Sequence, residues 1–192
     1  VDMLYILYDN EVYGLTKGQA GPTLGLGEKP KSLPRPNPQG KVNPLLLAFA
    51  SGYTWIARGY AYDVKGLKEL IKEGIAHRGL AFLHVLQPCP TYNDLHTKEW
   101  FAPRLYRLEE EGYDPLVPPG LPPEALEARM ARFQQKALEW GERIPVGVFW
   151  KAELPTFEAR LKAYLPRYPE AYPARGPETP LDLEGLLQEF AL

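Results

Sequence analysis

Hydrophobic runs that alternate with an amphipathic segment predict an α/β fold for most of the chain. Apolar residues dominate three short runs, at 3–8, 53–57 and 80–86, each bounded by polar residues, glycine or proline. Between the last two runs, apolar residues recur at helical spacing, at Val64, Leu67, Leu70, Ile71 and Ile75. The order strand, helix, strand is typical of a right-handed parallel βαβ unit. We therefore expect a parallel sheet with helices on both faces.

Capping residues mark the ends of two helices. Asn43 followed by Pro44 predicts the start of one helix, and Gly52 predicts its end. Asp63 predicts the start of the second helix, and Gly79 predicts its end. Both predicted helices lie between apolar runs, as a βαβ arrangement requires.

The pattern changes after the third apolar run. Residues 100–123 are charged and proline-rich, which predicts a surface excursion. A helix is expected from about Glu124, with Leu126, Met130, Phe133, Ala137 and Trp140 along one stripe. Residues 144–150 predict a short edge strand, because a proline and a glycine interrupt them. Residues 156–164 predict a short helix.

The chain is expected to comprise two regions. Residues 1–164 are predicted to form the α/β domain, and residues 165–192 a proline-rich tail that ends in an amphipathic turn. The first apolar run predicts a buried, central parallel strand, which needs neighbours on both sides. It begins at the third residue of the sequence, so we expect further chain upstream.

Composition excludes several classes of protein. The 192 residues carry 45% hydrophobic and 24% charged residues and a net charge of -2, which is ordinary for a globular protein and gives no basic surface for nucleic acid. The apolar runs are far shorter than the ~20 residues needed to span a membrane. One cysteine excludes an intrachain disulfide and fits a reducing compartment, so we expect a cytoplasmic protein.

Proline is unusually frequent. The chain has 21 prolines in 192 residues and only two methionines. Proline lowers the entropy of the unfolded chain, and thermolabile residues are scarce in heat-adapted proteins. The composition therefore indicates a thermophilic source.

The first candidate site follows the first strand, where Asp9 and Asn10 open a long segment rich in glycine and proline. Ligands of open α/β sheets bind at the edge where the strands end. The Asn10 side chain and the Val12 carbonyl could face one Mg²⁺ ion if the chain turns sharply, which Gly14 permits. The alternative is a plain turn, since Asp and Asn are common in turns.

Lys17 and Cys89 are the next candidates. Lys17 is a point charge suited to a carboxylate or a phosphate, or else an ordinary solvated lysine. Cys89 ends a strand in a Pro-Cys-Pro-Thr-Tyr-Asn loop, where packing alone does not call for cysteine, although a lone cysteine is normally a buried hydrophobe.

Arg58 and the three histidines are weaker candidates for a functional site. Arg58 could meet an anion or be an ordinary ion-paired arginine. His77, His84 and His96 lack the spacing of metal ligands, and His84, inside an apolar run, is predicted to be a hydrogen-bonded core residue.

The segment Asp9-Asn10-Glu11-Val12-Tyr13-Gly14-Leu15-Thr16-Lys17-Gly18-Gln19 resembles the β subunits of the 2-oxoacid:ferredoxin oxidoreductases. The loop around Cys89 is similar to that family's Pro-Cys-x-Thr-x-Asn loop. Residues 37–41, 57–61, 136–147 and 155–158 also resemble the family, so the likeness covers most of the chain.

The resemblance implies a partial thiamine diphosphate-binding fold, with residues 1–164 as its C-terminal part. It implies that Asn10 and Val12 bind Mg²⁺, and that Lys17 contacts the 2-oxoacid carboxylate or coenzyme A. It further implies that Cys89 is one of four ligands of a [4Fe–4S] cluster. The thiamine diphosphate segment is then formed by Asn10, Val12, Tyr13, Gly14, Leu15 and Thr16.

The implied activity is oxidative decarboxylation of a 2-oxoacid to an acyl-CoA, with electrons passed to ferredoxin and an α subunit holding the other half of the thiamine. The family's Gly-Asp-Gly metal segment and its three other cysteines are absent from these residues. We therefore expect the isolated chain to be inactive. A non-catalytic remnant or assembly module, and a different thiamine enzyme that does not need Cys89, are the alternatives.

Overall fold

The computed structural model describes residues 1–165, 168 and 188. The chain divides into two compact units, Val1–Leu154 and Pro155–Leu192. In the second unit, α5 (Phe157–Tyr164) begins after Thr156, whose hydroxyl accepts from the Ala159 N–H at 3.2 Å, as the predicted short helix requires. The expected boundary after residue 164 stays a prediction, and the amphipathic turn expected in the tail lies largely outside the described residues.

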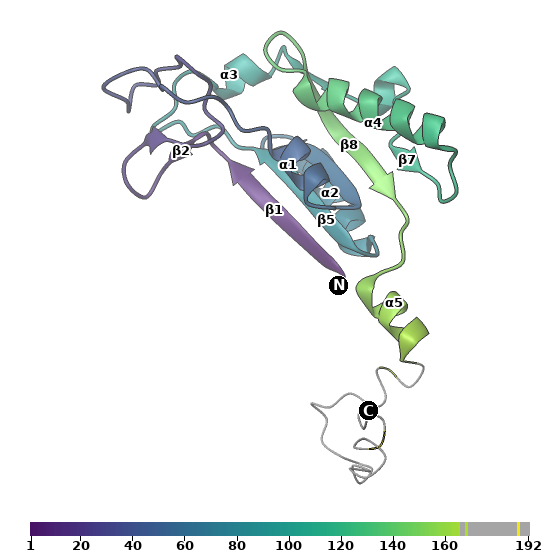
Figure 1. The fold of residues 1–192 in the computed structure, drawn as a ribbon. Coiled ribbons are helices and arrows are strands. Elements are labelled where there is room, and N and C mark those ends of the chain that lie inside the picture. Colours follow the sequence, from purple (N-terminus) through teal and green to yellow (C-terminus); the bar gives the residue numbers. More distant parts are fainter. Residues whose placement is uncertain (166–167, 169–187, 189–192) are drawn as a thin grey trace. The chain divides into compact units, whose positions relative to one another are not determined.

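The first unit is built on a six-stranded sheet, within the described residues, in the order β1-β5-β4-β8-β6, with β7 also paired to β8 (Figure 1). The strands are β1 (Met3–Asp9), β4 (Trp55–Tyr60), β5 (Leu80–Leu86), β6 (Leu105–Arg107), β7 (Leu116–Val117) and β8 (Ile144–Ala152). The strands β1, β5 and β4 are parallel, so they end at one edge, here called the carboxyl edge. Because β8 is antiparallel to β4, the sheet is mixed but mostly parallel.

Helices cover both faces of the sheet, which confirms the predicted α/β class. On one face, α1 (Pro44–Ala50) and α4 (Pro123–Leu138) share a core with Ile56, Phe82 and Phe149. On the other face, α2 (Val64–Ala76) packs Leu67, Leu70 and Ile71 against Trp55, Ala57, Ala81 and Leu83. The remaining helices of this unit are short: α3 (Lys98–Phe101) and the 3₁₀ turn Glu109–Glu111.

The predicted N-terminal caps of α1 and α2 are confirmed, whereas the predicted end of α2 at Gly79 is wrong, because α2 ends at Ala76 with His77 as its C-cap. The Asn43 Oδ1 accepts from the backbone N–H groups of Leu45 at 3.0 Å and Leu46 at 3.2 Å at the start of α1. The Asp63 Oδ1 accepts from the Gly66 N–H at 2.9 Å at the start of α2. These bonds satisfy backbone donors that have no partner inside the helix.

One expectation about the strands is wrong and another is not tested. Among the described residues β1 lies at the end of the strand order, beside β5, and Met3, Tyr5 and Tyr8 are exposed. A central, buried β1 was expected only together with further chain upstream, so that position stays a prediction. β8 is not an edge strand, because β4 lies on one side and β6 and β7 on the other. The interrupting Gly147 has φ 118°. The register between β4 and β8 shifts where Ile56 pairs with Trp150 and Ala57 with Val148, so Phe149 of β8 is left as the extra residue of a β-bulge.

The expected surface excursion at 100–123 instead contributes to the sheet and the core. It contains β6 and β7, and Phe101, Leu108 and Tyr113 are buried. The Tyr113 hydroxyl donates to the Phe149 carbonyl at 2.7 Å. Charge and proline content misled the prediction, because the buried residues are spread singly through the segment. Among the described residues, no helix combines the length and hydropathy of a membrane span.

We expect Phe133→Ala to lower the free energy of unfolding by about 3–5 kcal/mol. Phe133 is fully buried, and its ring lies 4.8 Å from that of Phe49 and 5.8 Å from that of Trp150. The matched control is Leu138→Ala on the same helix, where 63% of the side chain is exposed. Urea unfolding of the full chain measures both, and equal losses would contradict this packing.

Candidate functional site

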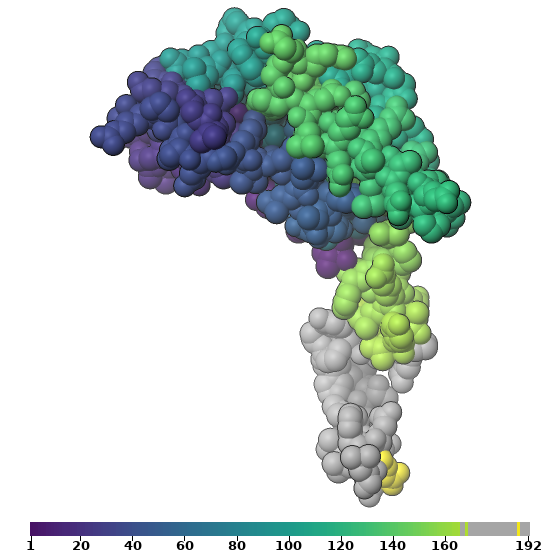
Figure 2. Space-filling view, turned by 45° about the horizontal axis from the view of Figure 1, so that its top comes forward, coloured from purple at the N-terminus to yellow at the C-terminus, as the bar shows by residue number. Residues whose placement is uncertain are grey.

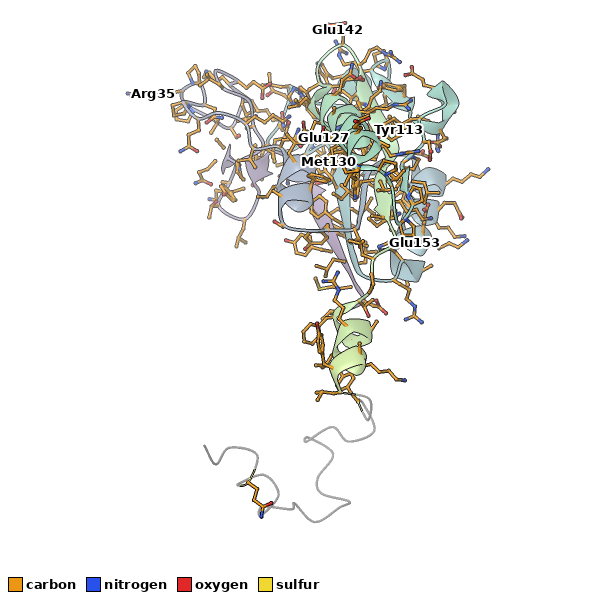
Figure 3. All side chains as sticks on the ribbon, turned by 45° about the vertical axis from the view of Figure 1, so that its right-hand side comes forward. Arg35, Tyr113, Glu127, Met130, Glu142 and Glu153 are labelled. Atoms are coloured by element: carbon orange, nitrogen blue, oxygen red, sulfur yellow. The ribbon has the colours of Figure 1, made fainter. Side chains whose placement is uncertain are left out.

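Two long loops meet at the carboxyl edge. Residues 10–43 follow β1, and residues 87–97 follow β5; Figure 1 shows both beyond the ends of these strands. Arg35 projects away from the sheet at the far end of the first loop (Figure 3). The Lys31 N–H donates to the Asp94 Oδ1 at 2.6 Å, and the Lys31 Nζ donates to the Pro90 carbonyl at 3.0 Å. The two loops are therefore held together.

Residues following α4 also close on this edge. The Lys41 Nζ lies 3.1 Å from the centre of the Trp140 ring, a cation–π contact. In the space-filling view, the dark-blue surface of the first loop and the green surface of α4 and the residues after it appear on the same side of this unit (Figure 2).

The turn after β1 places the Asn10 amide beside the Val12 backbone. The Asn10 Oδ1 accepts from the Val12 N–H at 3.0 Å, and the Asp9 Oδ1 accepts from the Glu11 N–H at 3.0 Å. Glu11 itself has φ 65°, in the left-handed region that a side chain seldom adopts. The sharp turn that the sequence suggested is made at Glu11 rather than at Gly14.

The Val12 carbonyl faces away from its partner strand. Val12–Tyr13 (β2) pairs antiparallel with Gln19–Ala20 (β3), and the Gly21 N–H donates to the Glu11 carbonyl at 2.8 Å. Since bonded and non-bonded pairs alternate in such a ladder, Val12 and Ala20 form a non-bonded pair. The Val12 N–H and C=O thus point outward, on the side where the Asn10 amide lies.

The hairpin that follows carries the other residues of the predicted segment. Tyr13, Leu15, Thr16 and Lys17 are exposed, and Leu15 is 99% exposed. Lys17 has φ 73°. The Gly14 carbonyl accepts from the Lys17 N–H at 3.2 Å, and a Cβ at Gly14 would meet nothing within 4 Å. The hairpin therefore presents Lys17 to solvent beside the turn.

Cys89 lies in the second loop and is half-buried. Its carbonyl accepts from the Asn93 N–H at 2.9 Å. The Asn93 Nδ2 in turn donates to the Asn10 carbonyl at 3.3 Å. The structure thus joins the loop of Cys89 to the turn of Asn10 and Val12 at one edge of the sheet.

A buried series of hydrogen bonds through Arg58, His84 and Asp9, here called the relay, links β4, β5 and β1 below these loops. The Arg58 Nε donates to the His84 Nδ1 at 3.2 Å, so the imidazole proton resides on Nε2, which donates to the Asp9 Oδ2 at 2.8 Å. The Thr23 hydroxyl donates to the Asp9 Oδ1 at 2.5 Å. His84 is the hydrogen-bonded core residue that the sequence predicted.

Arg58 fits neither expectation, because among the described residues its polar contacts are the His84 ring and the Pro145 carbonyl. Burial lowers the pKa of Arg58 to about 10. Burial lowers the pKa of His84 as well, although Asp9 partly offsets this. Burial alone would raise the pKa of Asp9, but hydrogen bonds from His84, Thr23 and the Glu11 backbone outweigh it and hold the pKa below its usual value. At neutral pH the relay is a cation, a neutral imidazole and a carboxylate.

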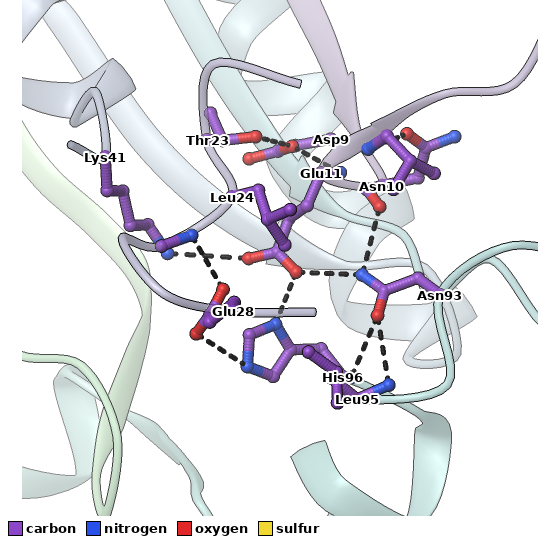
Figure 4. A network of polar contacts seen from close by, with 12 residues as sticks. Asp9, Asn10, Glu11, Thr23, Leu24, Glu28, Lys41, Asn93, Leu95 and His96 are labelled. Atoms are coloured by element: carbon purple, nitrogen blue, oxygen red, sulfur yellow. Dashed lines mark hydrogen bonds and ion pairs between the residues drawn. The ribbon is translucent and has the colours of Figure 1, made fainter. Parts of the chain in front are cut away.

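A second buried network, which no pattern in the sequence indicates, is centred on Glu11 (Figure 4). The Glu11 carboxylate accepts from Asn93 Nδ2 at 3.0 Å, contacts His96 Nδ1, and lies 3.5 Å from Lys41 Nζ. The Glu28 Oε1 lies 3.6 Å from the His96 Nε2. No spacing in the sequence marks this network, because its members are brought together from two loops.

The possible metal ligands at this edge suit Mg²⁺ in part, but they suit an iron–sulfur cluster poorly. An amide oxygen and an outward carbonyl are ligand types that Mg²⁺ accepts, usually together with a carboxylate and phosphate oxygens. A [4Fe–4S] cluster requires four thiolates, whereas the chain has one cysteine. These residues alone do not hold such a cluster.

Comparison with known proteins shows which families the chain resembles. Residues 1–85 match the family of the C-terminal TPP binding domain of thiamine pyrophosphate enzymes, and residues 89–165 match the C-terminal family of the pyruvate ferredoxin oxidoreductase beta chain. The chain is 58% identical over 177 residues to a 2-oxoacid:ferredoxin oxidoreductase subunit beta of Sulfolobus sp., covering 91% of this chain and 57% of the relative. It is 50% identical over 198 residues to the protein of that name from Saccharolobus solfataricus, covering 98% and 63%.

The chain belongs to the 2-oxoacid:ferredoxin oxidoreductase β-subunit family. It spans about 57–63% of the length of these two relatives. A solved 2-oxoglutarate:ferredoxin oxidoreductase from Magnetococcus marinus, with 2-oxoglutarate, coenzyme A and succinyl-CoA bound, superposes with a TM-score of 0.72 at 28% identity. That match covers 100% of this chain and 59% of the solved chain. The resemblance noted in the sequence is therefore confirmed, as is the fold that it implied.

Acidification is expected to lower the free energy of unfolding from about pH 6.5 downward. The pKa of His84 is lowered in the folded chain, so the unfolded chain takes up the proton first as the pH falls. Asp9, whose folded pKa is also lowered, adds to the loss only below about pH 4. His84→Gln should weaken the pH dependence of the free energy of unfolding above pH 5, as measured by urea unfolding at a series of pH values.

The matched control is His77→Gln. Burial lowers the pKa of His77 too, but this side chain is only half-buried and lies outside the relay, against the Thr54 hydroxyl at 2.8 Å. If His77→Gln weakened the pH dependence of the free energy of unfolding more than His84→Gln does, the assignment of this dependence to His84 would be contradicted.

Proposed function

We propose that this chain supplies part of the active site of a 2-oxoacid:ferredoxin oxidoreductase, which decarboxylates a 2-oxoacid oxidatively to an acyl-CoA. The observation that carries the proposal is the Asn10 amide lying beside the outward-facing Val12 backbone at the carboxyl edge. In this role the Asn10 Oδ1 and the Val12 carbonyl bind the Mg²⁺ that holds the diphosphate of thiamine diphosphate. Bound thiamine diphosphate supplies the electron sink for decarboxylation.

The residues of the hairpin bind and orient the cofactor and the substrates in this proposal. The exposed hairpin, with Tyr13, Gly14, Leu15 and Thr16, lies against the cofactor, and Lys17 attracts the 2-oxoacid carboxylate or coenzyme A. The support is that Lys17 stands solvent-accessible on a hairpin that begins at the proposed metal ligands. Coenzyme A and a 2-oxoacid are ligands of the similar Magnetococcus marinus structure.

Cys89 is proposed as one ligand of a [4Fe–4S] cluster that passes electrons to ferredoxin. One thiolate cannot hold the cluster, so the remaining thiolates, like the missing metal carboxylate, must come from residues outside this sequence. The relatives are named as β subunits, which supports an α subunit as the partner. The reaction is thus proposed for the assembled enzyme and not for this chain alone.

Asn10→Ala is expected to raise the Mg²⁺ concentration needed for activity by at least about tenfold, since even groups beyond the metal's own ligands are worth roughly 10–100-fold. The measurement is Mg²⁺-dependent, 2-oxoacid- and coenzyme A-dependent reduction of a low-potential dye by the assembled enzyme that contains this chain. Asn10→Asp is the matched control, because it keeps an oxygen for both Mg²⁺ and the Val12 N–H. An unchanged Mg²⁺ requirement in the Ala variant would remove Asn10 from the metal site.

Lys17→Gln is expected to raise the KM for the 2-oxoacid or for coenzyme A by roughly 10–100-fold, the loss of one charge-assisted contact. Glutamine removes the charge, keeps a polar side chain that is one atom shorter, and faces the same left-handed backbone constraint as lysine. Lys29→Gln, an exposed lysine of the same loop, is the control. Equal KM values for both substrates in the Lys17 variant and the wild type would refute the assignment.

A further inference from the structure

We propose that Asn93, acting with Glu11, is a positioning residue that holds the Asn10–Val12 turn against the loop that carries Cys89. The inference deepens the proposed function and rests on it, because the turn matters only if Asn10 and Val12 bind the metal. Neither Asn93 nor Glu11 offers an atom to the metal in this arrangement. Their effect is on where the two ligand atoms lie.

Asn93 uses its whole hydrogen-bonding capacity to join the two loops. It is 2% exposed. Its Nδ2 donates to the Asn10 carbonyl at 3.3 Å and to the Glu11 Oε2 at 3.0 Å, both in the first loop. Its Oδ1 accepts from the backbone N–H groups of Leu95 at 3.1 Å and His96 at 3.3 Å, both in its own loop. The surroundings fix the amide orientation, since two donors face the oxygen and two acceptors face the nitrogen.

Glu11 holds the turn in a conformation that its own sequence does not favour. A non-glycine residue at φ 65° is costly and persists only where neighbours determine it. Here the carboxylate is 5% exposed and contacts Asn93, His96 and Lys41. A Cβ at Gly21 would lie 2.8 Å from the Glu11 carbonyl, so the backbone is also confined from the other side.

The same contacts weigh against a separate metal site at this point. Glu11, Glu28 and His96 offer ligand atoms within 4.8 Å of one another. However, the ammonium group of Lys41 already lies 3.5 Å from the Glu11 carboxylate, and Asn93 donates to it. These partners satisfy Glu11, so the cluster fits a rigid support better than an ion site.

The test uses Asn93→Asp, which keeps the Oδ1 that accepts from Leu95 and His96 and removes both N–H donors of Nδ2, while it sets a carboxylate against Glu11. The matched control is Asn37→Asp. Asn37 is 3% exposed, and its Nδ2 donates to the carbonyls of Leu24, Gly25 and Gln39 at 2.9, 3.0 and 3.1 Å. It therefore suffers the same chemical loss inside the first loop, away from Asn10 and Glu11.

The first readout needs no cofactor. In the full chain, Asn93→Asp is expected to speed hydrogen exchange about tenfold in peptides that cover residues 10–14 and also in those that cover 87–92. Cys89 is the sole cysteine of the sequence, so a thiol reagent reports the second loop independently and should react faster. Unchanged exchange at residues 10–14, or the same change in the Asn37 variant, would overturn the inference.

The second readout separates positioning from plain destabilisation. In the assembled enzyme, Asn93→Asp should raise the Mg²⁺ requirement by roughly 10–100-fold, with activity recovered by added Mg²⁺, whereas Asn37→Asp should leave that requirement unchanged. Glu11→Gln combined with Asn93→Asp restores an N–H···O bond with donor and acceptor exchanged, and should recover part of the loss. An additive loss in the double variant, or an unchanged Mg²⁺ requirement, would overturn the positioning role.

Failure of the proposed function would look different. If the assembled wild-type enzyme needed neither Mg²⁺ nor thiamine diphosphate, the proposed function would fall, whatever the exchange experiment showed. If the wild type needed both and Asn93→Asp changed neither exchange nor the Mg²⁺ requirement, only the inference about Asn93 would fall.

Discussion

The carboxylate of Asp9 is the group on which the carboxyl edge of the sheet depends. It ends β1, and it accepts from the imidazole of β5, from the hydroxyl of Thr23 in the following loop and from the Glu11 backbone. A carboxylate in so buried a place is stable only because these donors, together with the Arg58 cation behind His84, compensate its charge. Strand, neighbouring strand and loop are thereby fixed to one side chain, and the next residue along is the proposed metal ligand Asn10.

This order of contacts explains why the turn is rigid where the hairpin beyond it is open. The backbone from Asp9 to Val12 is bonded on every side, by Asp9 itself, by Asn10, by Asn93 and by Gly21. From Tyr13 onward the side chains face solvent, although the hairpin backbone is paired. A metal ligand gains from a fixed position, because a misplaced oxygen costs affinity, whereas a group that meets a changing substrate gains from freedom. The proposed roles of Asn10 and Lys17 follow that division.

The sequence predicts the parts of this structure that depend on local pattern. The run at 80–86 becomes β5 with the predicted bounds, and Asn43 and Asp63 cap their helices as expected. The sequence does not predict the features that depend on contacts between distant segments. Nothing in Ile144–Ala152 shows that two strands will pair on its far side, and a sequence rich in proline and charge gives no sign that Tyr113 will be buried under Phe149.

The candidate site divides in the same way. Asn10, Val12, Lys17 and Cys89 could be proposed from the sequence because they lie in contiguous segments that resemble a family. Glu11 and Asn93 were missed as partners, because 82 residues separate them and no spacing in the sequence links the two loops. Yet these two explain how the chain can keep the two proposed metal-ligand oxygens and the proposed cluster cysteine in place. The buried bond from Asn93 to Glu11 forms within the chain, so the turn is preorganised before any ligand arrives, and binding need not repeat the entropic cost of ordering it.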